Sequence, residues 1–174
     1  MPQRPQTVRL AAAGNSPWIP LNRMNTSIAI LLGVNFSSNK NLTANVQYST
    51  DPLVPLPCTL SRTTTTATLT RTNHGLAVGD SVVVAGGGAP FDGTFAVASV
   101  PDQNTITYTV PNSGATAATN GCTVIPLRVQ NHPVLAGLVD DADSNFSVPP
   151  SVCRLNVSSY TAGYVDLNVI PGSK

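Results

Sequence analysis

Residues 41–50 read NLTANVQYST, a stretch in which apolar and polar side chains alternate from position 42 to position 49. Successive side chains of a β-strand point to opposite faces of the sheet, so this alternation predicts a strand with one face on a core and the other in solvent. The predicted inward side chains are Leu42, Ala44, Val46 and Tyr48, and the predicted outward ones are Thr43, Asn45, Gln47 and Ser49.

Strand patterns continue on both sides of this stretch. SIAILLGVNF (27–36) is apolar on both faces near its middle, which predicts a central strand, and TITYTV (105–110) repeats the strict alternation. Gly, Pro, Asp and Asn separate these segments, and regular short strands of this kind predict a sandwich or barrel. Further predicted strands are DSVVVAG (80–86), GTFAVASV (93–100), VCRLNVSSY (152–160) and YVDLNVI (164–170).

The composition as a whole favours β-structure. The chain of 174 residues contains no Glu and only two Lys, Lys40 and Lys174, so it lacks good helix formers and keeps strand and turn formers. Charged residues make up 10% and the net charge is +1, with no Lys/Arg cluster, so we expect no nucleic-acid or membrane partner. The first 21 residues lack the apolar core of a secretory signal, and no apolar run is long enough to cross a bilayer.

A shift in composition predicts the domain organisation. Residues 61–121 are rich in Thr and Gly, whereas both flanks use more Leu, Ile and Pro. Such a shift marks a domain boundary, so we predict a small inserted module at 61–121 within an outer domain made of 21–60 and 122–174. The predicted fold is all-β: an outer β-sandwich of the jelly-roll or immunoglobulin type, built from both chain ends, with a β-barrel-like insert.

The segment VVVAGGGAPFDGTF (82–95) has the three glycines with which a phosphate-binding loop begins. A phosphate loop also needs a Lys for charge, a Ser or Thr for the metal and a following helix. Ala89, Pro90, Phe91 and Asp92 follow instead, and Asp92-Gly93 is typical of a tight hairpin turn. We therefore expect a hairpin here and no cofactor.

The candidates for catalysis are few. His74 lies in a turn before a predicted strand, and His132 precedes a proline. No Gly-x-Ser-x-Gly elbow is present to hold a nucleophile, so we expect both histidines to bind backbone groups. We predict no catalytic residues and do not expect an enzyme.

The acidic loop DDADSNF (140–146) matches the first half of a calcium loop, through Asp141, Asp143 and Asn145. The second half fails, because Phe146 replaces the turn glycine and Val152 stands where the bidentate Glu belongs. Asp140, Asp141 and Asp143 also form a cluster of carboxylates, but neighbouring loop acids rarely face each other across a sugar. The prediction is a solvated loop without a metal.

The chain has three cysteines, Cys58, Cys122 and Cys153, without Cys-x-x-Cys spacing. This argues against a zinc site or a disulfide framework and favours small buried thiols in a reducing cytoplasm. Cys58 and Cys122 bracket the predicted insert.

Two phrases from opposite ends of the chain resemble a group of small structural proteins of tailed bacteriophages. The phrases are SPWIPLNRMNTSIAILLGVNFSSNKNLTANVQYSTDP and VCRLNVSSYTAGYVDLNVIPG. The middle phrase, TNHGLAVGDSVVVAGGGAPFDGTFAVASVPDQNTITYTV, resembles a small β module that recurs in phage tail and head accessory proteins. The residues that match at the chain ends are Trp18, Pro20, Val46, Gln47, Tyr48, Asp51, Pro52, Arg154, Asn156, Val157, Tyr160, Thr161, Gly163, Val165, Leu167 and Ile170.

The resemblance implies a virion structural protein that is assembled in the host cytoplasm. A head decoration (cement) protein is the leading expectation, with the major capsid protein or neighbouring virion proteins as partners and homo-oligomerisation. A neck, collar or tail-appendage protein is one alternative. A carbohydrate-binding module for host attachment, using Trp18, Tyr160 or Tyr164, is another.

The N-terminal residues 1–20 are expected to form an extended arm. Pro2, Pro5, Pro17 and Pro20 prevent a helix, and such an arm typically becomes ordered on the surface of a partner. The apolar side chains predicted to bind that partner are Val8, Leu10, Trp18 and Ile19.

Overall fold

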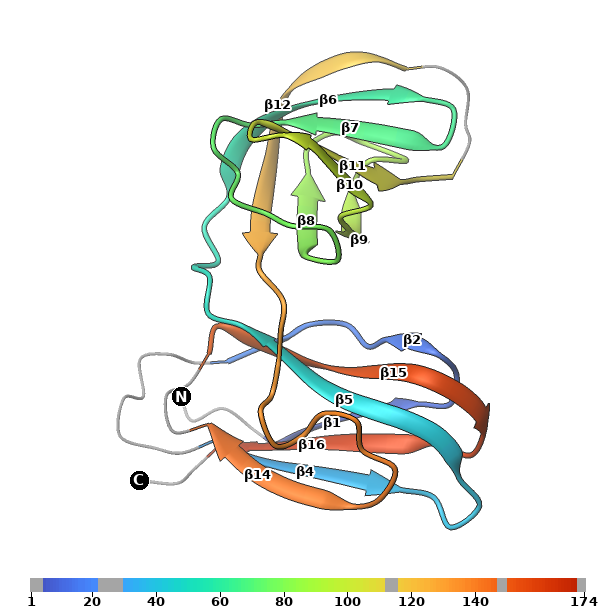
Figure 1. Ribbon diagram of the computed structural model, residues 1–174. Helices are drawn as coiled ribbons and strands as arrows, with labels where there is room; N and C mark the ends of the chain where they lie inside the picture. Colours follow the sequence, from blue (N-terminus) through green and yellow to red (C-terminus); the bar gives the residue numbers. More distant parts are fainter. Residues whose placement is uncertain (1–4, 22–29, 112–115, 147–149, 172–174) are drawn as a thin grey trace. The chain divides into compact units, whose positions relative to one another are not determined.

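The computed structural model describes residues 5–21, 30–111, 116–146 and 150–171 (Figure 1). The described part is built from β-strands without helices, so the all-β prediction is confirmed. No helix that could span a membrane occurs within these ranges. The chain divides into two compact units, one formed by Met1–Thr50 with Gln130–Lys174 and the other by Asp51–Val129.

The first unit is a sandwich of two antiparallel sheets, drawn as two layers in Figure 1. Side chains from both sheets fill its core, among them Val34, Val46, Leu155 and Leu167. One sheet has the order β1 (Gln6–Leu10), β16 (Val165–Pro171), β4 (Ile30–Phe36), β14 (Ala142–Phe146). The other has the order β13 (Gln130–Asn131), β5 (Asn41–Ser49), β15 (Val152–Ala162), β2 (Gly14–Asn15), with β3 (Ile19–Pro20) also paired to β15.

Strand β5 confirms the alternation for residues 42–47, whereas Ser49, predicted to face solvent, is fully buried at the end of the strand. Leu42, Ala44 and Val46 are buried in the sandwich core, whereas Thr43, Asn45 and Gln47 are partly exposed on the opposite face. The pattern was decisive because a shift of one residue would place every apolar side chain of the strand in solvent.

The second unit is a single antiparallel sheet that curls around its own core. Phe95 of β9 stacks on Tyr108 of β11 with ring centroids 4.5 Å apart, although these strands lie near opposite ends of the sheet order. This contact gives the unit the barrel-like curvature that was expected of the insert. The order is β10 (Ser99–Asp102), β11 (Thr105–Thr109), β7 (Thr66–Thr70), β6 (Leu56–Thr63), β12 (Thr116–Leu127), β8 (Ser81–Ala85), β9 (Gly93–Ala96).

The insert is longer than the predicted 61–121, because its boundaries fall at Asp51 and Val129. Its first strand β6 begins at Leu56, and its strand β12 runs to Leu127. These two strands pair with each other, and β12 also pairs with β8. The change in composition at residues 61 and 121 therefore falls inside β6 and β12. The hydrogen bonding between these strands, and not the composition, sets the limits of the insert.

The N-terminal segment is not a free arm in its described part. Strand β1 pairs with β16, and β2 and β3 both pair with β15, so residues from 6 onward belong to the edges of the two sheets. Proline is tolerated at sheet edges, where one N–H needs no ladder partner. The prolines are therefore compatible with β1, β2 and β3 as short edge strands, and they do not prevent these strands from pairing. Residues 1–4, with Pro2, lie outside the described residues.

Candidate functional site

The glycine-rich loop connects β8 to β9 in an antiparallel hairpin, as predicted, but the connection is the loop 86–92 and not a tight turn at Asp92-Gly93, because Gly93 already pairs with Val84 in β9. Asp92 in this loop accepts hydrogen bonds from the backbone N–H groups of Gly87 at 2.8 Å and of Gly86 at 3.3 Å. A bound phosphate would need these same donors. A Cβ on Gly87 would lie 2.6 Å from Leu60 Cδ1, so close packing explains this glycine without a ligand.

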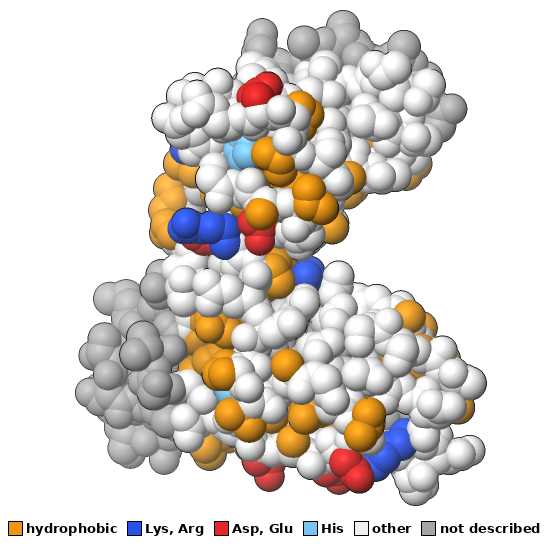
Figure 2. Space-filling view, viewed as in Figure 1, with side chains coloured by type: hydrophobic (Ala, Val, Ile, Leu, Met, Phe, Trp, Pro, Cys, Tyr) orange, Lys and Arg blue, Asp and Glu red, His pale blue; other side chains and the backbone are white. Residues whose placement is uncertain are grey.

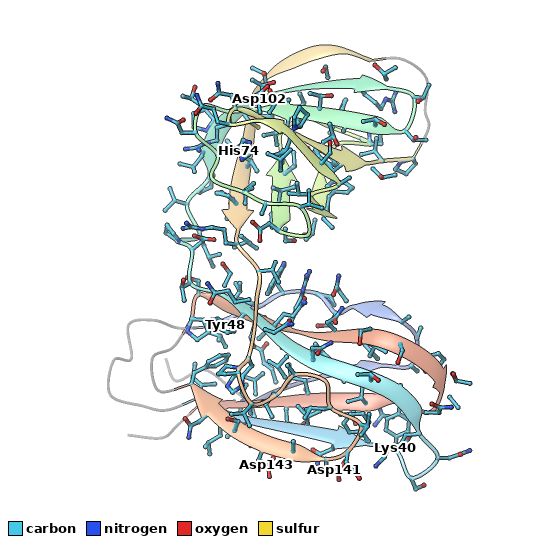
Figure 3. All side chains as sticks on the ribbon, viewed as in Figure 1. Lys40, Tyr48, His74, Asp102, Asp141 and Asp143 are labelled. Atoms are coloured by element: carbon cyan, nitrogen blue, oxygen red, sulfur yellow. The ribbon has the colours of Figure 1, made fainter. Side chains whose placement is uncertain are left out.

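His74 holds the backbone of the second unit together. Its Nδ1 accepts a hydrogen bond from the N–H of Leu76 at 3.0 Å, and its Nε2 lies 3.0 Å from the carbonyl oxygen of Asp102. Figure 3 shows the ring beside Asp102. Because Nδ1 is an acceptor, Nε2 carries the proton and donates to the carbonyl.

His132 repeats this arrangement in the first unit. Its Nδ1 accepts from the N–H groups of Val134 and Leu135 at 3.2 and 3.1 Å, and its Nε2 lies 3.2 Å from the carbonyl oxygen of Asn145. The ring also contacts Phe146 edge-on, with centroids 5.0 Å apart. Both histidines use both ring nitrogens on backbone groups, which leaves neither nitrogen to take a proton from a nucleophile.

Replacing His132 with alanine is expected to lower the unfolding free energy by about 2–4 kcal/mol, because it removes a buried ring and the partners of two N–H groups and one carbonyl. His74→Ala should have an effect of similar size on the second unit. Urea unfolding monitored by circular dichroism measures both. Thr66→Ala, at an exposed strand position, serves as the control and should change stability by less than about 0.5 kcal/mol. Unchanged stability in the His variants would show that the rings do not hold these turns.

The predicted acidic loop 140–146 is a strand for most of its length, because residues 142–146 form β14 and pair with β4, and its first carboxylates make contacts within the chain. Asp141 accepts a hydrogen bond from the backbone N–H of Phe36 at 2.6 Å, and Asp140 forms an ion pair with Lys40. This ion pair lowers the pKa of Asp140. Asp143 belongs to β14, and Figure 3 labels it beside Asp141. Within the described ranges, no three His, Cys, Asp or Glu side chains lie together as metal ligands would.

The four residues predicted to bind a partner are divided by the structure. Ile19 is 3% exposed in the sandwich core, and Val8 and Leu10 pack against that core. These three side chains therefore stabilise the chain's own fold, which corrects the expectation of an arm that holds them out for a partner. Trp18 is partly exposed, and the guanidinium of Arg154 lies 4.2 Å from its ring centroid. Burial lowers the pKa of Arg154 to about 10, so Arg154 remains charged at neutral pH.

A row of side-chain amides crosses the outward face of the sheet that contains β5. Asn156 donates to Asn15 at 2.8 Å, Asn45 donates to Asn156 at 2.9 Å, and the N–H of Gly137 donates to Asn45 at 2.7 Å. We call Asn15, Asn45 and Asn156 the amide row. Figure 2 shows few charged side chains on the visible face of the described residues. Such a surface suits hydrogen-bonded protein contacts with little electrostatic steering.

An open pocket of about 450 Å³ lies on the second unit, over β6 and the end of β7. Arg71 and Cys58 contribute to its lining, and Cys58 in turn faces Cys122 on β12. The sequence does not predict that these two thiols meet, because only the register of β6 and β12 brings them together. The pocket lining consists of Pro57, Cys58, Thr59, Thr70, Arg71 and Thr72.

No family model, curated protein or solved structure matches this chain.

Proposed function

We propose that this chain is a structural component of a tailed-phage virion, a head decoration protein that binds the capsid shell through its first unit. Its partners on this proposal are the major capsid protein and further copies of the chain. The observation that carries the proposal is the position of the two phage-like phrases. Although they come from opposite ends of the sequence, they form adjacent strands, with Gln47 of β5 opposite Arg154 of β15.

The module-like phrase supports the same proposal, because it falls within the second unit. Residues 72–110 lie inside Asp51–Val129, which has a hydrophobic core of its own around Phe91, Leu69 and Tyr108. An attached domain with its own core can be carried by a binding domain without contributing to the fold of that domain. We therefore assign shell binding to the first unit and a separate, projecting role to the second.

The amide row supports protein binding rather than catalysis as the use of the first unit. The three hydrogen-bonded amides are uncharged side chains of the kind found at protein interfaces, and the two histidines are already engaged in holding turns. The carbohydrate-binding alternative ranks lower because cationic groups lie over two of its candidate rings: Arg154 over Trp18 and, at 3.8 Å, Arg9 over Tyr164.

The copy number of the chain in purified virions tests the proposal. Quantitative mass spectrometry normalised to the major capsid protein should give hundreds of copies per particle for a protein that decorates an icosahedral shell. About a dozen copies would place it instead at the neck or tail, where ring symmetry limits the number. Absence from the particle would overturn the virion assignment and favour the carbohydrate-binding alternative.

Excision of the insert tests the assignment of shell binding to the first unit. Gln130 of β13 pairs with Tyr48 of β5, so Thr50 and Gln130 can be joined by a short Gly-Ser turn in place of residues 51–129. We expect the shortened chain to bind undecorated heads within about threefold of the full chain, as measured by co-sedimentation. Deletion of residues 1–20 is not a useful test, because it removes the sheet strands β1, β2 and β3. Loss of binding by a folded shortened chain would make the insert the attachment module.

A further inference from the structure

Cys58 and Cys122 face each other across two neighbouring strands of the second unit. They are directly opposed in the register of β6 and β12, and their Sγ atoms are 3.3 Å apart. The Cys122 thiol also lies 2.9 Å from the carbonyl oxygen of Cys58, to which it donates. Neither residue is in a disulfide, and they are 7% and 1% exposed respectively.

This placement is compatible with a disulfide. Directly opposed residues of an antiparallel pair have Cα atoms about 4.5–5.5 Å apart, which lies within the range of about 4.4–6.8 Å found for disulfides. The two sulfurs need to approach by about 1 Å to reach bonding distance, which a small side-chain rotation can supply. No strand has to move for the bond to form.

Cys58 is the more accessible of the two residues, 7% exposed against 1% for Cys122. Cys58 lines the open pocket of about 450 Å³, together with Arg71, whereas Cys122 is almost fully buried behind it. A small, uncharged oxidant that enters the pocket therefore meets Cys58 first. Burial raises the pKa of Cys58, and the positive charge of Arg71 offsets part of this effect, so the reactive thiolate forms mainly at alkaline pH.

We propose that Cys58 and Cys122 form an oxidation site at which a hydroperoxide produces a cross-strand disulfide between β6 and β12. With hydrogen peroxide, the Cys58 thiolate attacks one oxygen, the O–O bond breaks, and Cys58 sulfenic acid and hydroxide form; the hydroxide takes up the thiol proton and becomes water. The sulfur of Cys122 then attacks the Cys58 sulfur, the S–O bond breaks, and a second water leaves with the Cys122 proton. Two thiols and one peroxide thus give one disulfide and two waters.

The bond would join residues that are 64 positions apart, on the two strands by which the chain enters and leaves the insert. Closing a long loop restricts the unfolded chain, so the oxidised insert should be the more stable form. The chemistry does not depend on the proposed function. In a virion protein the oxidation would take place on release from the host, because the chain then passes from reducing to oxidising surroundings.

The pH dependence of the reaction follows from the groups around Cys58. Burial and the neighbouring Cys122 raise the pKa of Cys58 to about 12, against the opposing effect of Arg71. The third titratable neighbour, Tyr108 on β11, also has a raised pKa, so it stays neutral over the same range. The thiolate fraction, and with it the oxidation rate, should therefore rise about tenfold per pH unit between pH 7 and pH 10.

The test is oxidation of the reduced, full-length protein by hydrogen peroxide, followed by alkylation of the remaining thiols and peptide mapping. We expect a linked Cys58–Cys122 peptide, an alkylated Cys153, and a thermal midpoint of the second unit raised by about 10 °C or more. Cys153→Ser, which removes the buried thiol of the first unit, is the matched control and should form the same link. Cys122→Ser should stop at a Cys58 sulfenic acid that dimedone traps.

Three outcomes would overturn the proposal. They are the absence of the linked peptide in the folded wild-type protein at pH 10, a predominance of links to Cys153 or between chains, and dimedone labelling at Cys122 in place of Cys58. Circular dichroism before oxidation establishes that each sample is folded, and the wild-type peptide map remains decisive if a serine variant does not fold.

Discussion

Gly163→Ala is expected to lower the unfolding free energy of the first unit by about 3–5 kcal/mol. Gly163 lies between β15 and β16, where the chain passes from one sheet of the sandwich to the other, and its φ is +91°. A Cβ at this position would lie 2.7 Å from the backbone oxygen of Asn39 and 2.9 Å from Lys40 Cα. Because these are backbone atoms, the clash cannot be relieved by rotating a side chain.

Gly137→Ala is the matched control in the same unit. Gly137 also has a positive φ, +67°, but a Cβ there would have no neighbour within 4 Å. This substitution should therefore cost only the backbone strain of about 1–2 kcal/mol. Urea unfolding of both variants separates strain from crowding. Equal losses in the two variants would show that the corner at Gly163 can relax around a methyl group.

The alternation of side chains predicted a strand well where the strand has one buried and one exposed face. Strand β5 illustrates this, since a period of two fixes both the element and the face that packs. The limits of the insert were predicted wrongly because they depend on partners distant in sequence. Leu56 lies in a Leu- and Pro-rich stretch that was predicted to belong to the outer domain, but it pairs with Val124 inside the second unit.

The candidate site shows the same division between local and distant information. The hairpin at the glycine loop follows from local turn chemistry, whereas the hydrogen bonds from Gly86 and Gly87 to Asp92 required the folded loop. For the thiols, the sequence contained one signal: Cys58 and Cys122 bracket the predicted insert. That signal acquires chemical meaning only from the register of β6 and β12, which places the two sulfurs 3.3 Å apart.

A matched pair of core truncations should reveal how the two units depend on each other. Leu69→Ala in the second unit and Leu155→Ala in the first both remove a fully buried leucine, so each should lower the stability of its own unit by about 2–5 kcal/mol. The effects on the other unit should differ, because the second unit is continuous in sequence and the first is not.

The asymmetry arises from loop closure. The two ends of the folded second unit are held together by the ion pair of Asp51 with Arg128 and by the pairing of β6 with β12. The strands β5 and β13, which flank the second unit in sequence, are therefore already close enough to pair. When the second unit unfolds, the first must close a flexible loop of about 80 residues at a cost of the order of 3–4 kcal/mol. Unfolding of the first unit imposes no such cost on the second.

Hydrogen exchange followed separately for amides of β5 and of β7 measures the two stabilities. In Leu69→Ala, the amides of β7 should exchange faster. The amides of β5 should then exchange mainly from molecules in which the second unit is unfolded, because the first unit is less stable in that state. In Leu155→Ala, only β5 should lose protection. Equal loss in both units with either variant would mean that the chain unfolds as one cooperative body, and the independence of the two cores would then have to be abandoned.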